Sequence, residues 1–240
     1  MARTVNEKEY ALKRNQILDV AQRLIYTKGY EQMSIQDILE ALQISKGAFY
    51  HYFDSKPAVL EAVIERIQQE TLQILDPIVR DPHLPALEKL QRYFDTAVQW
   101  KTARKGFLIE LVRVWYTDHN AIVRQKMWAT LTKQAMPLLS AMFHQGIREG
   151  ALTIPFPDQI GPIVLSMIES LGDGFAELIL APEPRGDELQ RAERLIAAYN
   201  DALERLLGAP AGSLRLMSTE SLRDWFGAPS DAAIAESSWA

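Results

Sequence analysis

A short segment near the N-terminus carries side chains that bind anions. From Ser45 to Lys56 the sequence reads SKGAFYHYFDSK, with lysine, tyrosine and histidine in close succession. Lysine ammonium and tyrosine hydroxyl groups reach phosphate oxygens, and a helix N-terminus also attracts phosphate. The small residues Gly47 and Ala48 let a helix backbone approach the edges of bases. This chemistry indicates contact with nucleic acid, although an aromatic cluster is also a common feature of a protein core.

The aromatic residues of this segment fall into two sets when they are placed on a helix. At ~100° per residue, Phe49 and Phe53 share one side, and Gly47 and His51 lie on the opposite side. We expect the two phenylalanines in the core. A short helix that already buries two phenylalanines cannot also bury two tyrosines and a histidine, so we expect these at the surface.

Two helix starts in quick succession position this segment. Ser34 is a good N-cap, and Asp37 completes a capping box with it. Ser45 repeats the N-cap pattern after a turn at residues 42–44. A longer helix precedes them and ends at Gly29. Together these elements predict a helix-turn-helix.

The rest of the chain also reads as helical. Apolar residues recur at helical spacing and strand patterns are almost absent, which predicts an all-α fold. We expect an N-terminal three-helix helix-turn-helix domain over residues 1–56, followed by a C-terminal helical ligand-binding and dimerisation domain over 57–207. The further helices are expected near residues 56–75, 86–102, 105–117, 121–149, 159–180 and 187–207.

The remaining residues, 208–240, form a C-terminal tail rich in Ala, Gly, Ser and Pro. This composition predicts weak order, with one amphipathic turn at SLRDWF. The alternative is that Trp225 and Phe226 dock on the core or on a partner subunit.

Composition limits the possible functions. The formal net charge of −5 restricts any nucleic-acid contact to a small local surface. Cysteine is absent, and the four histidines lack the spacing of metal ligands. The sequence has neither a glycine-rich phosphate loop nor a nucleophile elbow. We therefore expect no enzyme, no metal and no cofactor. Without a secretory signal or a long apolar span, we expect a cytoplasmic protein with no membrane partner.

The first quarter of the chain strongly resembles the TetR family of transcriptional regulators. The resemblance rests on Gly29-Tyr30, on Ser34, on the run from Ser45 to Phe53, and on Ser55-Lys56. Two features depart from the common pattern: the order Tyr-His-Tyr-Phe at 50–53, and a turn at 42–44 without the usual glycine. The resemblance implies a dimeric repressor that binds a palindromic double-stranded DNA operator and leaves it when a small hydrophobic effector binds.

The resemblance also implies DNA contacts for individual residues. The positions of Gly47 and Tyr50 commonly approach bases, and Gln36 is a further candidate for a base contact. Phosphate contacts are implied for Lys46, His51, Tyr52 and Lys56, and Ser34 caps the helix whose N-terminus meets the DNA backbone. Ala48 completes the set as the second small residue of the segment. A basic arm formed by Arg3, Lys8, Lys13 and Arg14 is one interpretation of the N-terminus, and a solvated helix end is the other.

Family resemblance implies that the last two long helices pair with their counterparts in a homodimer. Each of them carries an apolar stripe that needs a partner. The interface residues expected from these stripes are Val164, Ile168, Leu171, Leu189, Ile196, Tyr199 and Leu203.

Aromatic and methionine residues of the middle helices are candidates for an effector pocket, because such side chains line apolar ligand sites. The expected lining is Trp100, Phe107, Glu110, Leu111, Trp115, Trp128, Phe143 and Met167. Core packing is the alternative for the apolar members, and an ion pair with Arg113, three residues later, is the alternative for Glu110.

Two other functions fit parts of the sequence. A transcriptional activator with the same fold has the same helix-turn-helix. An all-helical small-molecule carrier or enzyme explains the C-terminal helices but has no need for exposed tyrosine, histidine and lysine on one short helix.

Overall fold

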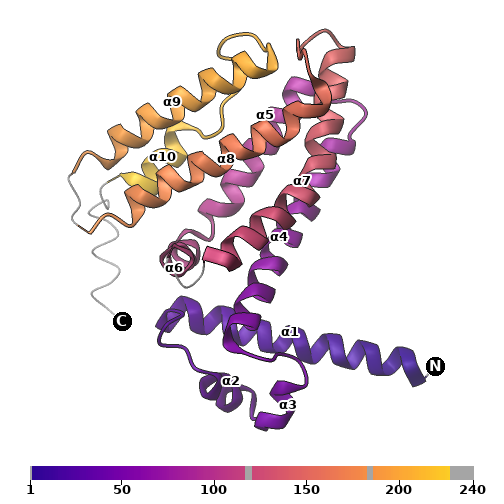
Figure 1. The fold of residues 1–240 in the computed structure, drawn as a ribbon, viewed down its shortest axis with the longest axis vertical. Coiled ribbons are helices and arrows are strands. Elements are labelled where there is room, and N and C mark those ends of the chain that lie inside the picture. Colours follow the sequence, from indigo (N-terminus) through magenta and orange to yellow (C-terminus); the bar gives the residue numbers. More distant parts are fainter. Residues whose placement is uncertain (1, 117–120, 183–185, 228–240) are drawn as a thin grey trace. The chain divides into compact units, whose positions relative to one another are not determined.

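The computed structural model describes residues 2–116, 121–182 and 186–227. Within these ranges the regular structure is entirely α-helical, as the sequence predicts. The helices are α1 (Ala2–Lys28), α2 (Ile35–Leu42), α3 (Lys46–Tyr50), α4 (Lys56–Arg80), α5 (Ala86–Thr102), α6 (Lys105–Trp115), α7 (Ala121–Arg148), α8 (Pro157–Ile179), α9 (Glu188–Leu207) and α10 (Thr219–Phe226) (Figure 1). No helix among the described residues has both the length and the apolar character needed to cross a bilayer.

The chain divides into two compact units. The smaller unit comprises residues 1–70 and 106–131, and the larger comprises 71–105 and 132–240, as far as these ranges are described. The predicted boundary after residue 56 therefore lies inside the smaller unit. The reason is that α4 packs on α1 through its first half: Arg66 donates hydrogen bonds to Asp19 (2.7 Å) and Gln22 (2.6 Å).

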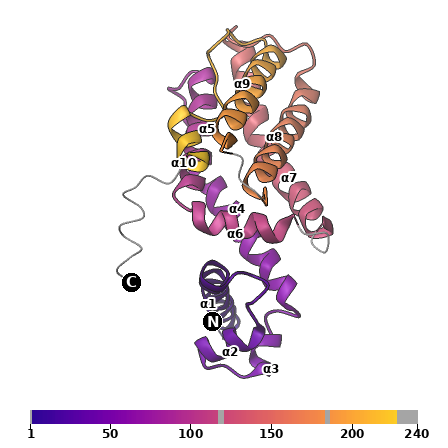
Figure 2. The ribbon, with the colours of Figure 1, turned by 90° about the vertical axis from the view of Figure 1, so that its left-hand side faces the viewer.

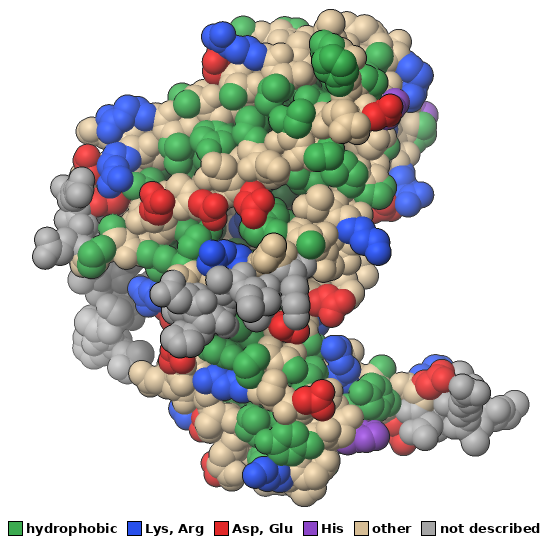
Figure 3. Space-filling model, viewed as in Figure 1, with side chains coloured by type: hydrophobic (Ala, Val, Ile, Leu, Met, Phe, Trp, Pro, Cys, Tyr) green, Lys and Arg blue, Asp and Glu red, His purple; other side chains and the backbone are tan. Residues whose placement is uncertain are grey.

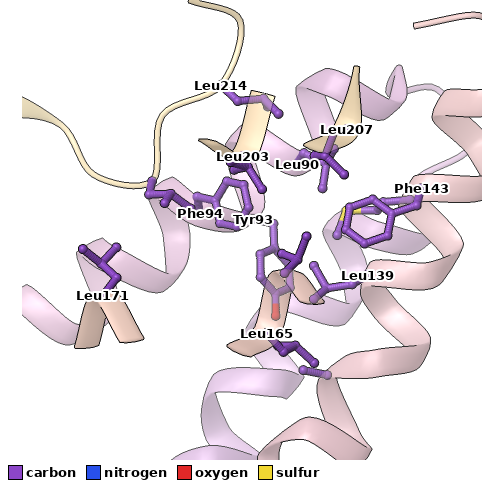
Figure 4. Packing of buried hydrophobic residues seen from close by; sticks show 14 of the residues in the cluster. Leu90, Tyr93, Phe94, Leu139, Phe143, Leu165, Leu171, Leu203, Leu207 and Leu214 are labelled. Carbon is purple, nitrogen blue, oxygen red and sulfur yellow. The ribbon is translucent and has the colours of Figure 1, made fainter. Parts of the chain in front are cut away.

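The larger unit is built around a continuous apolar core. α8 and α9 lie side by side, and α10 packs against α9 and α5 (Figure 2). Figure 4 shows leucine and aromatic side chains of this core, which come from α5, α7, α8, α9 and the C-terminal segment. Its labelled members are Leu90, Tyr93 and Phe94 of α5, Leu139 and Phe143 of α7, Leu165 and Leu171 of α8, Leu203 and Leu207 of α9, and Leu214.

The weak order predicted for the tail is wrong for residues 209–226. Three leucines of this segment are buried in the core: Leu214 (3% exposed), Leu216 (6%) and Leu222 (2%). The indole N–H of Trp225 donates to Thr102 Oγ1 (2.9 Å), and the Phe226 ring lies 5.2 Å from that of Phe175. The alternative, that Trp225 and Phe226 dock on the core, is what the structure has.

Polar side chains of α9 hold the backbone of the same segment. The buried carboxylate of Glu204 accepts hydrogen bonds from the backbone N–H groups of Gly212 (3.0 Å) and Leu214 (2.9 Å). Asn200 accepts from Leu216 N–H at 2.9 Å. Because each of these bonds satisfies a backbone group that the chain turns inward, the segment is fixed although its composition is that of a loop.

Candidate nucleic-acid interface

The N-terminus of α2 is closed by a complete capping box. Ser34 Oγ accepts from the backbone N–H of Asp37 (3.1 Å), and the Asp37 carboxylate accepts from the backbone N–H of Ser34 (2.8 Å). Lys28 Nζ adds a hydrogen bond to the same carboxylate at 2.6 Å. The hydrogen bond from Lys28, followed by those from Ser34, lowers the pKa of Asp37 to about 2. The capping predicted from the sequence is confirmed.

The stability of this cap depends on pH in a defined direction. Because the folded pKa of Asp37 lies below its ordinary value of 3.8, its charged form stabilises the fold fully above that value. The stabilisation is lost as the pH falls toward about 2. We expect Asp37→Asn to lower the melting temperature of the full-length protein at neutral pH, with the difference shrinking between pH 3.8 and about 2. Asp54→Asn, at an exposed carboxylate, is the control. A difference that stays constant over this range would show that the charge of Asp37 is not its source.

The turn between α2 and α3 is formed without glycine. Gln43 adopts the left-handed conformation, with φ 52° and ψ 42°. Its backbone N–H donates a hydrogen bond to the carbonyl oxygen of Glu40, and the backbone N–H of Ile44 donates to that of Leu39 at 3.1 Å. Ser45 then caps α3 by accepting from Ala48 N–H at 3.1 Å. Gln43 thus takes the left-handed position that glycine commonly occupies at the end of a helix, and the turn keeps its usual hydrogen bonds.

The apolar side of α3 anchors it in the smaller unit. Phe49 is 0% exposed and Phe53 is 5% exposed, which confirms their predicted place in the core. The guanidinium of Arg14, on α1, lies 5.1 Å from the centre of the Phe53 ring. The helix itself ends at Tyr50, so Tyr52 lies in the turn that follows.

The other side of α3 is open. Lys46, Gly47, Tyr50 and His51 are exposed, and the Lys46 ammonium lies 5.9 Å from the centre of the Tyr50 ring. A Cβ atom added to Gly47 would meet nothing nearer than Ser45 Oγ, at 4.0 Å. The fold therefore does not require glycine at this position, and the absence of a side chain leaves the surface in front of α3 open.

Three other predicted contact residues already have partners within the chain. Ser34 is engaged in its cap, and Gln36 donates to Glu40 Oε1 (2.9 Å) while remaining exposed. Lys56 donates to the backbone oxygen of Glu31 (3.1 Å) and lies 4.3 Å above the ring of Tyr30. This anchoring gives Lys56 a structural role that the sequence did not predict. Ala48 and Tyr52 are half-buried.

Helix α1 contributes one side chain that the sequence analysis did not connect with DNA binding. The ring of Tyr10 contacts those of His51 and Tyr52, and Lys13, a member of the predicted basic arm, borders a small hollow of about 140 Å³ beside α3. The spacing of Tyr10, Arg14 and Ile17 along one helix face was the available signal. The hollow is lined by Lys13, Gln16, Ile17, Leu42, Ile44, Ala48 and Tyr52. On the face in Figure 3, basic side chains are scattered among acidic ones, in keeping with the net charge of −5.

The residues predicted to line an effector pocket are divided between the units. In the smaller unit Phe107 and Leu111 are buried, and Glu110, Trp115 and Trp128 are half-buried. Glu110 forms an ion pair with Arg113 at 2.6 Å, which is the alternative that the sequence offered for this residue.

In the larger unit, Phe143 is 1% exposed and belongs to the core, which is the alternative interpretation of that residue. Met167 packs against the same core and is half-buried. Trp100 is also buried, and its indole N–H has no hydrogen-bond partner among the described residues. The guanidinium of Arg104 lies 4.2 Å from the centre of its ring.

Four of the residues predicted at a dimer interface face the core of their own chain. Val164 and Leu203 are 0% exposed, Ile196 is 5% exposed and Leu171 is 7% exposed within a single chain. Val164 and Leu203 leave no surface for a partner subunit to bury, and Ile196 and Leu171 leave very little, so the core of their own chain already accounts for these four positions. Ile168, Leu189 and Tyr199 are half-buried, and the Tyr199 hydroxyl donates to Ser170 Oγ at 2.8 Å.

A comparison of sequences agrees with this geometry. The family model described as bacterial regulatory proteins, tetR family, matches residues 17–63, which contain the second half of α1, α2, α3 and the start of α4. The repressor DhaR of Mycobacterium sp. (strain GP1) is 24% identical over 64% of this chain and 74% of its own length. The regulator EthR of Mycolicibacterium smegmatis is 38% identical over 59% of this chain and 65% of its own length. A regulator of Lactococcus lactis is 48% identical over only 26% of its own length.

Solved structures share the fold. A transcriptional regulator from Cytophaga hutchinsonii superimposes with a TM-score of 0.62 at 16% identity, over 81% of this chain and 98% of its own. A TetR-family regulator from Pectobacterium atrosepticum gives a TM-score of 0.60 at 20% identity, over 85% and 98%. The capped starts of α2 and α3, the α3 helix with one buried and one exposed side, and these matches support the same conclusion. The chain carries the DNA-binding region of the TetR family of bacterial transcriptional regulators.

Proposed function

We propose that this protein is a cytoplasmic repressor that binds a palindromic DNA operator as a homodimer and releases it when a small hydrophobic molecule binds. The observation that carries the proposal is the open side of α3, where Lys46, Gly47, Tyr50 and His51 are exposed on a helix whose other side is locked in the core. Two relatives, DhaR and the Escherichia coli protein NemR, are named as transcriptional repressors, which favours repression over activation.

DNA contacts follow from the chemistry of this surface. Gly47 and Tyr50 would lie against base edges in the major groove, because the missing side chain of Gly47 leaves room for close approach. Lys46, His51 and Tyr52 would donate hydrogen bonds to phosphates on either side. The capped N-terminus of α2, which carries Ser34 and Gln36, would lie near the DNA backbone at the side of the same groove. There it would attract a further phosphate.

The dimer would form through the outward face of α8 and α9. This face carries the exposed Ile163 (48%) and, on α9, the exposed Ala198 with half-buried neighbours such as Tyr199 and Leu195. Small and apolar residues on two adjacent helices suit a four-helix contact with a second copy. A two-fold dimer places two copies of α3 one or more DNA turns apart, about 34–36 Å per turn, which is why the operator would be palindromic.

Release requires an effector that prefers the state that does not bind DNA. Half-buried Trp115 and Trp128 of the smaller unit are the effector contacts that we retain, because part of each side chain is accessible. The ligand must bind the DNA-free state more tightly, and by linkage DNA must weaken ligand binding by the same factor. A coupling of about 1–3 kcal/mol is typical of such systems.

The test is selection of DNA by the full-length protein from a random duplex library. We expect enrichment of a palindrome, bound by two chains per duplex, with a scrambled duplex of equal composition bound far more weakly. Small hydrophobic compounds that quench tryptophan fluorescence are then added to the complex, and some should lower its affinity. The absence of any enriched sequence would contradict DNA recognition. One chain per duplex would contradict the dimer, and tight ligands without effect on DNA affinity would contradict release.

A further inference from the structure

Tyr10 lies outside the helix-turn-helix and yet contacts two of its proposed DNA-binding side chains. Its ring centre is 5.5 Å from that of His51 with the planes at 83°, and 4.8 Å from that of Tyr52 with the planes at 37°. The rings of His51 and Tyr52 are themselves 5.1 Å apart at 79°. The three rings thus form a closed cluster in which each contacts the other two, at separations typical of stabilising aromatic pairs.

This cluster is at the surface and is not part of the hydrophobic core. Tyr10 is 38% exposed, His51 is exposed and Tyr52 is half-buried. The fold of α3 is already secured by Phe49 and Phe53, so the ring of Tyr10 adds little to it. What Tyr10 does restrict is the rotation of two polar aromatic side chains that follow the exposed side of α3.

We propose that Tyr10 is a positioning residue for DNA binding, which rests on the proposed function of the α3 surface. Its ring holds the His51 imidazole and the Tyr52 phenol in place before DNA arrives, with their N–H and O–H groups free to reach phosphates. A side chain that DNA must order loses rotational freedom on binding, and this loss weakens the affinity. A side chain that is already ordered avoids this cost. Tyr10 therefore raises affinity without itself contacting DNA.

The experiment compares full-length wild type with Tyr10→Ala, Tyr10→Phe and Tyr26→Ala on the duplex enriched by selection. Tyr26 is a second exposed tyrosine of α1, and its ring lies beside Gly106. We expect Tyr10→Ala to weaken binding about 3- to 10-fold, the range for ordering one or two side chains. Tyr10→Phe keeps the ring and should stay within about 2-fold, as should Tyr26→Ala. Melting temperatures of all variants should stay within a few degrees of that of wild type, so that every variant is folded at the assay temperature.

A cycle with His51→Ala and Tyr52→Ala separates positioning from direct contact. In the double His51→Ala, Tyr52→Ala background, Tyr10→Ala should cost less than about 2-fold, because the rings that it positions are gone. An undiminished loss in that background, or an equal loss for Tyr10→Phe, would show that Tyr10 contacts DNA directly and would overturn the proposal. So would wild-type affinity for Tyr10→Ala. If wild type itself prefers no duplex, the proposed function fails and this inference fails with it, whereas failure of the Tyr10 variants alone leaves the proposed function standing.

Discussion

Replacing Leu203 by aspartate will unfold the larger unit. Leu203 is 0% exposed and lies in the core of α5, α7, α8 and α9 (Figure 4). The substitution removes an apolar side chain, which by itself costs about 2–5 kcal/mol in buried positions. It also leaves a carboxylate without a partner, which costs about 3–5 kcal/mol more when a buried charge is uncompensated. This sum reaches the whole stability of an ordinary domain, about 5–15 kcal/mol, so circular dichroism should show loss of helix at room temperature.

Ala198→Glu is the matched variant on the same helix. Ala198 is exposed on α9, so the substitution leaves the core intact and places a charge on the proposed dimer face. In a two-fold interface each chain would bring one such charge into the apolar contact, which disfavours association. We expect a folded protein by circular dichroism that sediments as a monomer. A folded, thermally stable Leu203→Asp protein would contradict the packing of α9, and a dimeric Ala198→Glu protein would place the dimer contact elsewhere.

Leu222→Ala will lower the melting temperature by about 5–15 °C. The side chain is 2% exposed in the core, where deletion to alanine costs about 2–5 kcal/mol. For a chain of this size, each kcal/mol corresponds to about 2–4 °C. Arg223→Ala, at the exposed neighbouring position of α10, should change stability by less than about 0.5 kcal/mol. Equal melting temperatures for the two variants would show that the C-terminal segment does not stabilise the larger unit.

The helix-turn-helix was predictable because its determinants are local. Ser34 and Asp37 are three residues apart, and their capping box forms within a single turn of chain. The burial of Phe49 and Phe53 follows from their spacing alone, since a short helix has one side to bury.

The burial of the apolar stripes on α8 and α9, and the order of the C-terminal segment, could not be predicted from local patterns. An apolar stripe shows that a helix face is buried, but it does not show what covers it. Val164 and Leu203 are covered by their own chain, including residues 214–222, which composition had marked as weakly ordered. The order of that segment depends in part on a side chain far along the chain, since Gln91 accepts a hydrogen bond from Arg215 N–H across 124 residues. Tyr10 was missed for a similar reason, since its contacts join α1 to residues after α3.

The operator affinity of Gly47 variants tests the central claim most directly, namely that the open side of α3 lies against DNA. A Cβ atom at this position meets nothing nearer than Ser45 Oγ at 4.0 Å, and alanine and leucine both favour helix over glycine, so the melting temperature should hold or rise. Thr27→Leu, at an exposed position near the end of α1, is the control for added bulk.

On the selected duplex, we expect Gly47→Leu to bind about 10- to 100-fold more weakly than wild type, the loss expected when a good base contact is removed. Gly47→Ala should lose less, and Thr27→Leu should bind as wild type does. Wild-type affinity for Gly47→Leu, in a protein with unchanged melting temperature, would contradict the placement of α3 against the bases.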